Sequence, residues 1–388
     1  MRRRPVLVYR DFLLPISETF IKSQAEGLDR FIAYYAGLRR IQGIEVPTER
    51  VIEFQRKGWL GAPGNAIFKF TGLAPEAMIR IRRVRPVLVH AHFGVDASRV
   101  MRVAAALRLP LLVTLHDYDV TTSDEQLRKL APYCATYIRR RPALGRRATA
   151  FIAVSDFLRR RAVARGFPEH KIVVHYIGVD VRRFERRAGA GEPIVLFVGR
   201  LAEKKGCRYL IEAMAKVEAA HPEVRLVIAG DGPLRGELEA QAAATLRRCS
   251  FVGAQSSDEI RRWYQRARLL CAPSVTAASG ETEGLPITVL EAQAVGLPVV
   301  STVHSGIPEA VLHEQTGLLA PERDSEALAR HLMTVLRDVD LGARLGAAGA
   351  ERVRERFDLQ KQNAALEDLY ARVAADPSRS GASMRAGL

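Results

Sequence analysis

SGETEGLPITVLEA, residues 279–292, is the stretch that decides how the rest of the chain is interpreted. Two carboxylates, Glu283 and Glu291, flank a Gly-Leu-Pro that is typical of a helix start, because Pro suits the first helical position and Gly284 lets a ligand approach the backbone. A helix start binds anions through its free N–H groups and its positive dipole end. The carboxylates could accept hydrogen bonds from hydroxyls on either side. A nucleotide diphosphate sugar, with ribose at one end and hexose at the other, has the matching shape.

Short apolar runs alternate with helical patterns along nearly the whole chain, which is typical of parallel α/β structure. We therefore predict an α/β fold of two Rossmann-like domains, each a doubly wound parallel sheet, facing each other across a ligand-binding cleft. The candidate strands of the first half are Val6–Tyr9, Phe31–Tyr35, Val87–His92, Leu111–His116, Phe151–Val154 and Ile172–Tyr176. Those of the second half are Ile194–Val198, Leu226–Ala229, Phe251–Val252, Leu269–Ala272, Val299–Thr302 and Gly317–Leu319.

A polar, glycine-rich passage, residues 182–192, separates the two series of strands and indicates a domain boundary. The predicted domains are residues 1–183 and residues 184–357. Residues 358–375 are expected to form a helix that packs back toward the first domain. The Ser/Gly/Ala-rich residues 376–388 are expected to be a disordered tail.

The 388-residue chain carries a net charge of +16, and the whole basic excess is in the first half. Residues 1–188 hold 35 Lys/Arg against 17 Asp/Glu, whereas residues 189–388 hold 24 against 26. Basic clusters at 139–141, 146–147 and 159–161, mixed with apolar and aromatic side chains, suit an anionic membrane surface. A merely solvated basic surface is an equally good interpretation, and nucleic-acid binding is a poorer one.

The sequence indicates a cytoplasmic protein, peripheral at the inner face of the cell membrane if the basic half binds there. The apolar run near the start is interrupted by Arg10 and Asp11, too early for a signal peptide. No run approaches the roughly 18 apolar residues of a membrane helix. No CxxC or Cys/His cluster indicates zinc or a redox pair, so we expect structural thiols in a reducing compartment at Cys134, Cys207, Cys249 and Cys271.

The passage FVGRLAEKKG, residues 197–206, forms the first strand, loop and helix start of the second domain. Arg200 lies where the strand should end and Lys205 just before the next helix, so both can point into the cleft at one diphosphate. Such cations, together with helix amides, stabilise a departing diphosphate as its negative charge develops. In isolation an Arg and a Lys in a loop are usually solvated. In the same domain as residues 279–292 they are interpreted as donor-binding residues, together with Gly284, Leu285 and Pro286.

Five motifs of the second half occur in one order: GRL with KG at 199–206, GDGP at 230–233, EGLP with LEA at 283–292, GLPVV at 296–300 and GIPE at 306–309. This set resembles the signature of glycosyltransferase family 4, whose members are retaining enzymes of the GT-B fold. The likeness covers nearly the whole chain and is most specific from about residue 193 to residue 320.

The resemblance implies a role for each motif residue. Arg200 and Lys205 would hold the diphosphate, Glu291 the ribose hydroxyls and Glu283 the transferred sugar. His116, at the end of a first-domain strand, would contact the donor sugar; the alternative is a strand-end histidine bonded to a neighbouring loop. Glu283, His116, Arg200 and Lys205 are therefore grouped as catalytic, and the loop after Val252 and Gly253 is expected to meet the base through backbone groups.

We expect no metal ion and no other cofactor. Asp117-Tyr118-Asp119 spells the Asp-x-Asp by which another glycosyltransferase fold binds a metal, but residues 338–340 spell it too, in a helix linker. Arg200, Lys205 and the helix amides can already neutralise the diphosphate. His90 and His92 share a strand face but lack an evident third metal ligand. We place four candidates on the acceptor side instead: Ser17, Glu18, His92 and Asp117.

The loop after the first strand, residues 9–20, has no glycine, whereas many relatives have a Gly-rich loop there. Direct donor contact by this loop is therefore not favoured. Ser17-Glu18-Thr19-Phe20, with HAHFG at 90–94, resembles the branch of the family that builds bacterial exopolysaccharide, capsule or O-antigen repeat units. Acceptors in that branch are commonly carried on polyprenyl diphosphate, which would explain a basic first domain.

The sequence thus predicts a retaining hexosyltransferase that moves a sugar from a UDP- or GDP-sugar to a hydroxyl of a lipid-linked saccharide. The resemblance implies a front-face mechanism without a protein nucleophile. A sugar-nucleotide epimerase or a phosphorylase could share the fold, although no pyridoxal lysine context supports the latter. A non-catalytic membrane partner that only binds nucleotide sugar is the remaining alternative.

Overall fold

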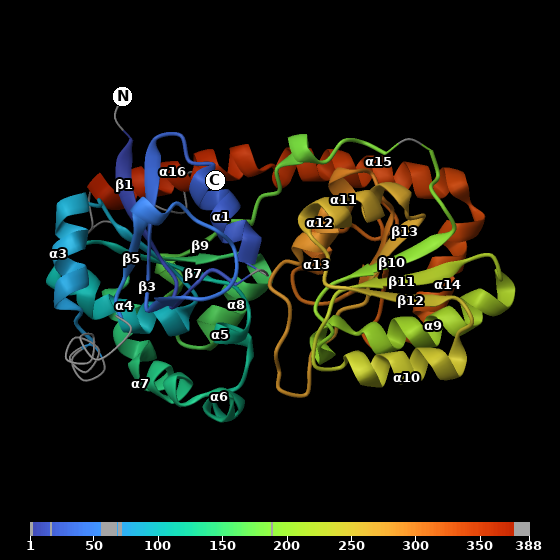
Figure 1. The fold of residues 1–388 in the computed structure, drawn as a ribbon, viewed down its shortest axis with the longest axis horizontal. Helices are drawn as coiled ribbons and strands as arrows, with labels where there is room; N and C mark the ends of the chain where they lie inside the picture. Colours follow the sequence, from blue (N-terminus) through green and yellow to red (C-terminus); the bar gives the residue numbers. More distant parts are fainter. Residues whose placement is uncertain (1–2, 16–17, 56–67, 69–71, 188, 376–388) are drawn as a thin grey trace. The chain divides into compact units, whose positions relative to one another are not determined.

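The computed structural model describes residues 3–15, 18–55, 68, 72–187 and 189–375. These residues form two compact units, each built on a parallel sheet (Figure 1). Unit 1 comprises the described residues up to Gly178 and those from Leu359 onward, and unit 2 runs from Val179 to Asp358. The predicted α/β fold with two Rossmann-like parallel sheets is confirmed. The chain divides at 178/179 and 358/359, a few residues from the boundaries expected at 183/184 and 357/358; the expected tail, 376–388, lies outside the described residues.

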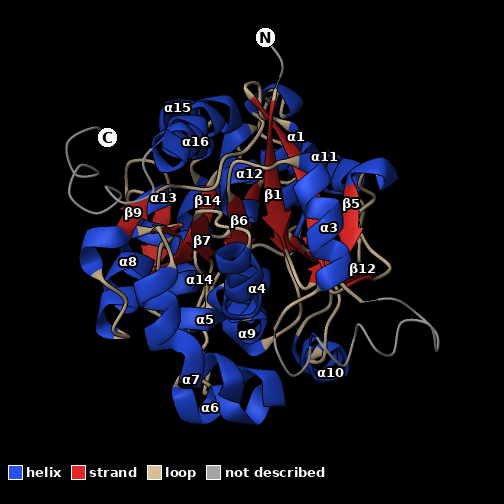
Figure 2. Ribbon diagram, turned by 90° about the vertical axis from the view of Figure 1, so that its left-hand side faces the viewer, coloured by secondary structure: helices blue, strands red, loops and turns tan. Residues whose placement is uncertain are grey.

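Seven parallel strands form the sheet of unit 1 in the order β5-β3-β1-β6-β7-β8-β9. In Figure 2 the strands labelled β5, β1, β6, β7 and β9 follow one another from right to left. Six of the seven were expected, and the seventh, β5, has only three residues. Their bounds are β1 Arg4–Tyr9, β3 Phe31–Gly37, β5 Val51–Glu53, β6 Val89–His92, β7 Leu111–Leu115, β8 Ala150–Ala153 and β9 Ile172–Val174; β2 Phe12–Leu13 and β4 Arg39–Arg40 pair separately.

Helices cover both faces of this sheet. One face forms a hydrophobic core with the helices α1 and α16, to which Ile21, Leu366 and Tyr370 contribute. On the other face α4 contacts β1, β6 and β7, and α7 packs on α4. The bounds are α1 Thr19–Glu26, α3 Pro75–Val84, α4 Gly94–Ala106, α5 Tyr118–Thr121, α6 Asp124–Leu130, α7 Pro132–Arg147, α8 Asp156–Ala164 and α16 Leu359–Ala375.

Six parallel strands form the sheet of unit 2 in the order β12-β11-β10-β13-β14-β15. All six were expected from the sequence, with small differences at their ends. The chain moves from β10 outward to one side and later from β13 to the other, so the two central strands form the switch point of the sheet. The bounds are β10 Ile194–Val198, β11 Arg225–Ala229, β12 Cys249–Gly253, β13 Leu269–Ala272, β14 Val299–Thr302 and β15 Leu318–Ala320.

The helices of unit 2 also form two layers. The main core lies between the sheet and the helices α9 and α14, while α11, α12 and α15 cover the other face (Figure 1). The bounds are α9 Cys207–Ala220, α10 Arg235–Thr245, α11 Ser257–Arg266, α12 Ile287–Ala294, α13 Ile307–Ala310, α14 Ser325–Arg337 and α15 Val339–Arg356. Short 3-10 turns are η2 Thr48–Arg50, η4 Glu169–Lys171, η5 Val181–Arg183 and η6 Glu203–Lys205.

Two glycines let the loops at the carboxyl ends of the unit 2 strands lie directly against each other. Gly206 has a φ of 64°, and a Cβ there would lie 1.9 Å from the carbonyl oxygen of Pro273. Gly230 has a φ of 151°, and its Cβ would lie 1.8 Å from the carbonyl oxygen of Gly199. Because only glycine fits both the backbone and the space, these contacts fix the loops after β10, β11 and β13 relative to one another.

Candidate functional site

The candidate site of unit 2 lies at the switch point, where the loop after β10 meets the loop after β13. Parallel strands end at one edge of a sheet, and ligands of such folds bind where adjacent loops diverge. The first loop, residues 199–206, carries Arg200 and Lys205, and the second, residues 273–286, carries Glu283. Gly206 joins the two loops by its close approach to Pro273. Residues 78 positions apart in sequence therefore face one another.

A buried ion pair stands at the centre of this site. The Nζ of Lys205 donates to Oε2 of Glu283 at 3.0 Å, and the side chain of Glu283 is only 8% exposed. The Nζ of Lys204 lies 4.0 Å from the other oxygen of Glu283 and 2.7 Å from Glu281. A carboxylate is held next to an ammonium group, so a group that can accept hydrogen bonds from hydroxyls lies beside a cation that can bind a phosphate.

The backbone of Glu283 is held by a buried network that sequence reasoning missed. Its N–H donates to Nε2 of His304 at 3.1 Å, and its carbonyl oxygen accepts from the hydroxyl of Ser305. The Nδ1 of His304 lies 2.6 Å from Glu322, whose carboxylate also accepts the backbone N–H of Thr276 at 2.7 Å. Since Nε2 accepts, Nδ1 carries the proton and donates it to Glu322. The network connects the ends of β13 and β14 to the Glu283 loop.

Glu291 lies in the second turn of α12, with Tyr264 of α11 as its partner. The hydroxyl of Tyr264 donates to Oε2 of Glu291 at 3.0 Å. Burial raises the pKa of Glu291 to about 7, although the Tyr264 hydrogen bond and the charge of Arg183 act in the opposite direction. A carboxylate that already accepts a hydrogen bond from one hydroxyl group can accept further hydrogen bonds through its remaining lone pairs. The helix itself begins at Ile287, one residue later than expected, so Pro286 stands at the N-cap and not at the first helical position.

The remaining donor-side candidates line the same edge. Arg200 is exposed and its side chain makes no hydrogen bond or ion pair with another described residue, so its guanidinium is available to a ligand. The carbonyl oxygen of Val252 accepts from the side chain of Gln255 at 2.8 Å, and that of Gly253 accepts from the N–H of Gly230 at 2.8 Å. Those two carbonyl groups therefore already accept hydrogen bonds within unit 2.

In unit 1, the loop after β1 is held by a buried charge network rather than by glycine. The guanidinium of Arg10 donates to Glu18 at 2.8 Å, pairs with Asp96 and lies 4.5 Å from the centre of the Phe93 ring. The N–H of Asp11 also donates to Asp96, at 2.8 Å. Glu18, an acceptor-side candidate, is thus a buried partner of Arg10. Ser17, the neighbouring candidate, lies outside the described residues.

The two candidate histidines of unit 1 bond to each other. The Nδ1 of His92 and the Nε2 of His116 are 3.0 Å apart, and the rings of Phe20 and Phe93 lie 5.0 Å and 4.6 Å from the His116 ring. His92 and His116 are 1% and 6% exposed. Burial, and then the charge of Arg10, lowers the pKa of His116 to about 3, so the ring is neutral. The structure places both rings inside unit 1; contact of His116 with a donor sugar stays a prediction.

The Asp-x-Asp of unit 1 is used for helix capping. The carboxylate of Asp117 accepts the N–H of Tyr118 at 2.6 Å at the start of α5. The buried Asp119 accepts the N–H groups of Gly94 and Asp117 at 2.7 Å and 3.2 Å. Within the described ranges, no three His, Cys, Asp or Glu side chains gather in a way that could hold a metal ion.

Unit 2 therefore brings together Lys205, Glu283 and the start of α12, and unit 1 brings together Glu18, His92 and His116 in its own interior. Sequence reasoning missed His304 and Tyr264, the side chains that orient the two glutamates. His304 follows β14 by two residues. A polar residue at the carboxyl end of a predicted parallel strand was the signal available for it. Tyr264 lies on a helix face and carried no such signal.

Two family models match the chain. The model of "Glycosyltransferase Family 4" matches residues 28–183, and the model of "Glycosyl transferases group 1" matches residues 179–352.

Curated relatives match over much of the chain. A protein named as a colanic acid biosynthesis glycosyltransferase, WcaL of Salmonella typhimurium, is 34% identical over 290 residues, 72% of this chain and 69% of its own length. The amylovoran biosynthesis glycosyltransferase AmsK of Erwinia amylovora is 38% identical over 197 residues, 50% of this chain and 48% of its own.

Solved structures share the fold. The Anabaena protein HepE, crystallised with UDP and glucose, superposes with a TM-score of 0.76 at 22% identity, over 94% of this chain and 99% of that one. Sucrose-phosphate synthase of Thermosynechococcus elongatus superposes with a TM-score of 0.73 at 21% identity, over 96% of this chain and 100% of the other. At these identities, both superpositions show similarity of fold alone.

Proposed function

Because the chain belongs to the glycosyltransferases of family 4, with the GT-B fold, we propose that it moves a hexosyl unit from a nucleotide diphosphate sugar to a hydroxyl of a growing exopolysaccharide. The observation that carries this proposal is the 3.0 Å pair of Lys205 and Glu283 at the switch point of unit 2. In a nucleotide sugar, the hexose is bonded to the outer phosphate. A phosphate-binding cation and a hydroxyl-binding carboxylate must therefore be neighbours.

We assign the donor's parts to residues of unit 2. The diphosphate binds Lys205, the exposed Arg200 and the N–H groups at the start of α12, near Gly284, Leu285 and Pro286. The hexose hydroxyls bond to Glu283, and the ribose hydroxyls bond to Glu291, which keeps Tyr264 as its second partner. The loop beyond Val252 and Gly253 meets the base. When the donor binds, the ammonium group of Lys205 divides its hydrogen bonds between Glu283 and the diphosphate.

The chemistry proposed for this site is transfer with retention and without a metal ion. As the bond between hexose and diphosphate breaks, negative charge grows on the leaving oxygen, and Lys205 and Arg200 are the fixed cations beside it. The leaving oxygen then takes the proton of the acceptor hydroxyl, so Glu283 holds the sugar and transfers no proton. In this proposal His116 contacts the donor sugar. The acceptor side is assigned to unit 1, where Ser17, Glu18, His92 and Asp117 are the candidates.

The donor class and the acceptor class rest on the relatives. HepE was solved with UDP and glucose, and the relatives WcaL and AmsK are named for colanic acid and amylovoran biosynthesis. We infer a UDP- or GDP-sugar as donor and a saccharide carried on a polyprenyl diphosphate as acceptor. A lipid-linked acceptor suits a protein that works at the cytoplasmic face of the cell membrane.

An anionic membrane surface is proposed as a partner of unit 1. Five arginines and Ile79, which is 51% exposed, line one open hollow of about 910 Å³ in this unit. These arginines are Arg3, Arg4, Arg82, Arg83 and Arg85. Lipid phosphates attract such clusters, at about 1 kcal/mol per basic residue near the surface. Within the described part of the chain, no helix has the length and apolar character to cross a membrane.

The transfer proposal is tested by incubating the purified protein with UDP- and GDP-sugars and a lipid extract, with EDTA present. We expect a glycosylated lipid product whose new bond has the anomeric configuration of the donor, seen by NMR. Glu283→Gln should abolish transfer, whereas Glu281→Gln, two residues away, should retain it. Conversion of the donor without an acceptor would indicate an epimerase. Nucleotide-sugar binding without turnover under all conditions would indicate a non-catalytic partner, and inactivation by EDTA would overturn the metal-free assignment.

A further inference from the structure

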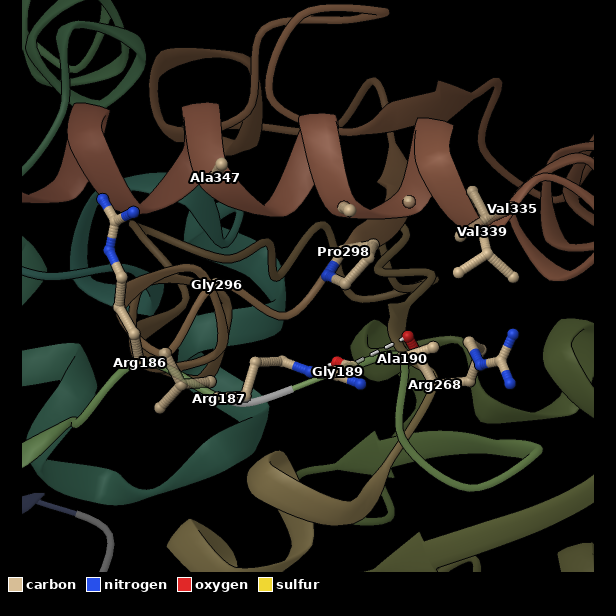
Figure 3. Close-up of a pocket in the computed structure, with 13 residues that line it drawn as sticks. Arg186, Arg187, Gly189, Ala190, Arg268, Gly296, Pro298, Val335, Val339 and Ala347 are labelled. Atoms are coloured by element: carbon tan, nitrogen blue, oxygen red, sulfur yellow. Dashed lines mark hydrogen bonds between the residues drawn. The ribbon is translucent and has the colours of Figure 1, made fainter.

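A cavity of about 280 Å³ lies at the edge of unit 2 where the strands begin, opposite to the edge that carries the donor site. Arg268 directly precedes β13 and Pro298 directly precedes β14, and both line this cavity. Figure 3 shows the hollow between the helix that carries Ala347, which is α15, and a lower side with Arg187, Ala190 and Arg268. Parallel strands place their two ends on opposite edges, so the cavity is separate from the donor site.

One wall of the cavity is apolar and is kept open by the small side chains of α15. Ala343 and Ala347 line it, as does Gly342, opposite Pro298. A Cβ on Gly346 would lie 2.1 Å from the carbonyl oxygen of Gly296, so the helix is held directly on the turn before β14. This contact fixes the size of the hollow, which is close to the lower end of the roughly 300–1,000 Å³ of small-molecule sites.

Three arginines and no Asp or Glu are among the described residues that line the cavity. The guanidinium of Arg187 donates to the carbonyl oxygens of Ala267 at 2.6 Å and Gly189 at 3.2 Å. That of Arg268 donates to Gly191 at 3.2 Å, and its buried Nε has no partner among the described residues. Arg186 pairs with Glu351 at 3.6 Å, where both side chains are more than half exposed.

The cavity thus holds two neighbouring cations that no carboxylate of the described residues neutralises. Burial, and then the charge of Arg268, lowers the pKa of Arg187 to about 10. Holding like charges together away from water costs free energy, which an anion between them would offset. The apolar wall beside them offers nothing to a bare inorganic ion but suits a hydrocarbon group.

We propose that this cavity is a binding site for a small organic phosphate, with its phosphate at Arg187 and Arg268 and its apolar group against Pro298 and α15. The guanidinium groups match a phosphate in both charge and hydrogen-bond geometry. The proposal concerns a site apart from the donor site and does not depend on the proposed transfer reaction.

The cavity lies between two segments of unit 2 that are far apart in the sequence. Arg186 and Arg187 follow shortly after the chain enters unit 2 at Val179, and α15 ends shortly before the chain leaves it at Asp358. A ligand in the cavity contacts residues 186–190 and the first half of α15, from Val339 to Ala347, and so holds these two segments of unit 2 together. Ligand binding should therefore slow hydrogen exchange in residues 189–191 and in α15.

The test uses hexyl phosphate as probe and calorimetry on the full chain, with inorganic phosphate and hexanol as partial probes. We expect one site for hexyl phosphate and at least about tenfold weaker binding of either partial probe. Ala343→Phe should fill the hollow and weaken binding at least about tenfold, whereas Ala348→Phe, an exposed alanine on the same helix outside the cavity, should not. Arg268→Met should weaken binding as strongly as Ala343→Phe.

The Lys205→Ala variant separates the cavity from the donor site, because it removes a cation there and leaves the cavity intact. Hexyl phosphate should bind this variant as it binds the wild type. Binding that disappears in Lys205→Ala and persists in Ala343→Phe would assign the probe to the donor site and overturn the proposal. No binding to the wild type, or binding of inorganic phosphate as tight as that of hexyl phosphate, would overturn it as well.

Discussion

Lys205 is the residue on which the proposed transfer depends most directly. Its ammonium group lies 3.0 Å from Glu283 and is a cation that the proposal assigns to the departing diphosphate. Lys205→Ala should lower kcat about 100- to 1,000-fold, the usual effect of removing one group that stabilises developing charge. The matched control is Lys216→Ala, an exposed lysine of α9 away from the site, which should keep wild-type turnover. Near-normal turnover of Lys205→Ala would contradict the assignment.

We expect His304 to act through Glu283 and not on a substrate. It accepts the N–H of Glu283 at 3.1 Å and donates to Glu322, so its loss leaves both groups without that partner. His304→Ala should reduce kcat/KM about 10- to 100-fold, as loss of a supporting side chain behind a functional group usually does. His313→Ala, at a half-exposed histidine of the same unit, is the control.

A structural effect alone would act on stability and leave the kinetics of the folded fraction unchanged. For His304→Ala we therefore measure the donor KM and kcat on protein that remains folded by circular dichroism. An unchanged kcat/KM in the folded fraction would show that His304 supports only the fold.

Glu291 makes the stability of unit 2 depend on pH. Because burial raises its pKa from an ordinary value of about 4.3 to about 7, the folded protein favours the protonated form. The contribution of protonated Glu291 to the free energy of unfolding is fully present below about pH 4.3 and is lost as the pH rises through 7. Glu291→Gln, which stays neutral, should therefore be more stable than the wild type at pH 8, by about 1–3 kcal/mol, and similar at pH 4.5. Urea unfolding at both pH values measures the difference; equal stability of variant and wild type at pH 8 would contradict it.

The same residue should make donor binding depend on pH in the opposite sense. The ionised carboxylate is the better acceptor for ribose hydroxyls, so affinity for a nucleotide sugar should rise from pH 5.5 to 8 in the wild type and stay level in Glu291→Gln.

At this scale the sequence predicted the motif residues but not their partners. Glu283, Lys205 and Glu291 stand in motifs whose spacing is visible along the chain. Their partners His304 and Tyr264 lie 21 and 27 residues from the glutamates that they contact, and only the pairing of strands and helices brings them near. His116 lies where a strand end was expected, yet its ring is enclosed by Phe20 and Phe93, which spacing along the sequence could not indicate.

At the scale of elements, α16 completes the core of unit 1 from far along the chain. The hydroxyl of its Tyr370 lies 2.6 Å from Nδ1 of His90, and the carboxylate of Glu367 accepts the N–H of Arg30 at 2.7 Å. Tyr370→Phe removes the first bond and keeps the packing, so it should cost about 1–3 kcal/mol, because a buried ring nitrogen loses its partner. Hydrogen exchange in β6 and α16 should rise while α9 stays protected; Tyr209→Phe, on α9, is the control.

Elements with strong apolar periodicity were predictable, and charged or short ones were not. The six strands of unit 2 match the expected runs. The sequence also predicts a helix at 156–165 with Ser155 as its N-cap, and in the structure Ser155 caps α8 by accepting the N–H of Leu158. The helices α6 and α7 were missed because α6 is short and highly charged, and because the Arg-rich sequence of α7 and its internal proline, Pro142, obscure the helical pattern. The sequence also predicts a helix over residues 66–83. In the described residues from 72 onward the helix, α3, begins at Pro75; the earlier part, apart from residue 68, lies outside the described residues.

At the scale of the whole molecule, charge is distributed unequally between the units. The basic excess of residues 1–188 includes the arginine cluster around Ile79. The protein should sediment with vesicles that contain phosphatidylglycerol at low salt, and about 0.5 M salt should release it because screening shortens the electrostatic range to a few ångströms. Substituting Arg82→Gln with Arg83→Gln should weaken this binding, and Arg330→Gln with Arg344→Gln, in unit 2, should not.

A second pair of variants separates two basic surfaces of unit 1. Arg146→Gln with Arg147→Gln, at the end of α7, should have the smaller effect if the hollow beside Ile79 is the contact. Sedimentation that ignores salt and all these substitutions would contradict an electrostatic attachment.

The discontinuity of unit 1 has a consequence for how the protein is made. Residues 359–375 leave the ribosome only after the whole of unit 2, yet α16 supplies Leu366, Leu369 and Tyr370 to the core of unit 1. During synthesis unit 2 can fold as soon as it is made. The sheet formed by the first 178 residues lacks α16 on one face until the end of the chain has been made. Chains released before residue 359 would therefore expose apolar surface to chaperones and proteases, which selects for completed molecules.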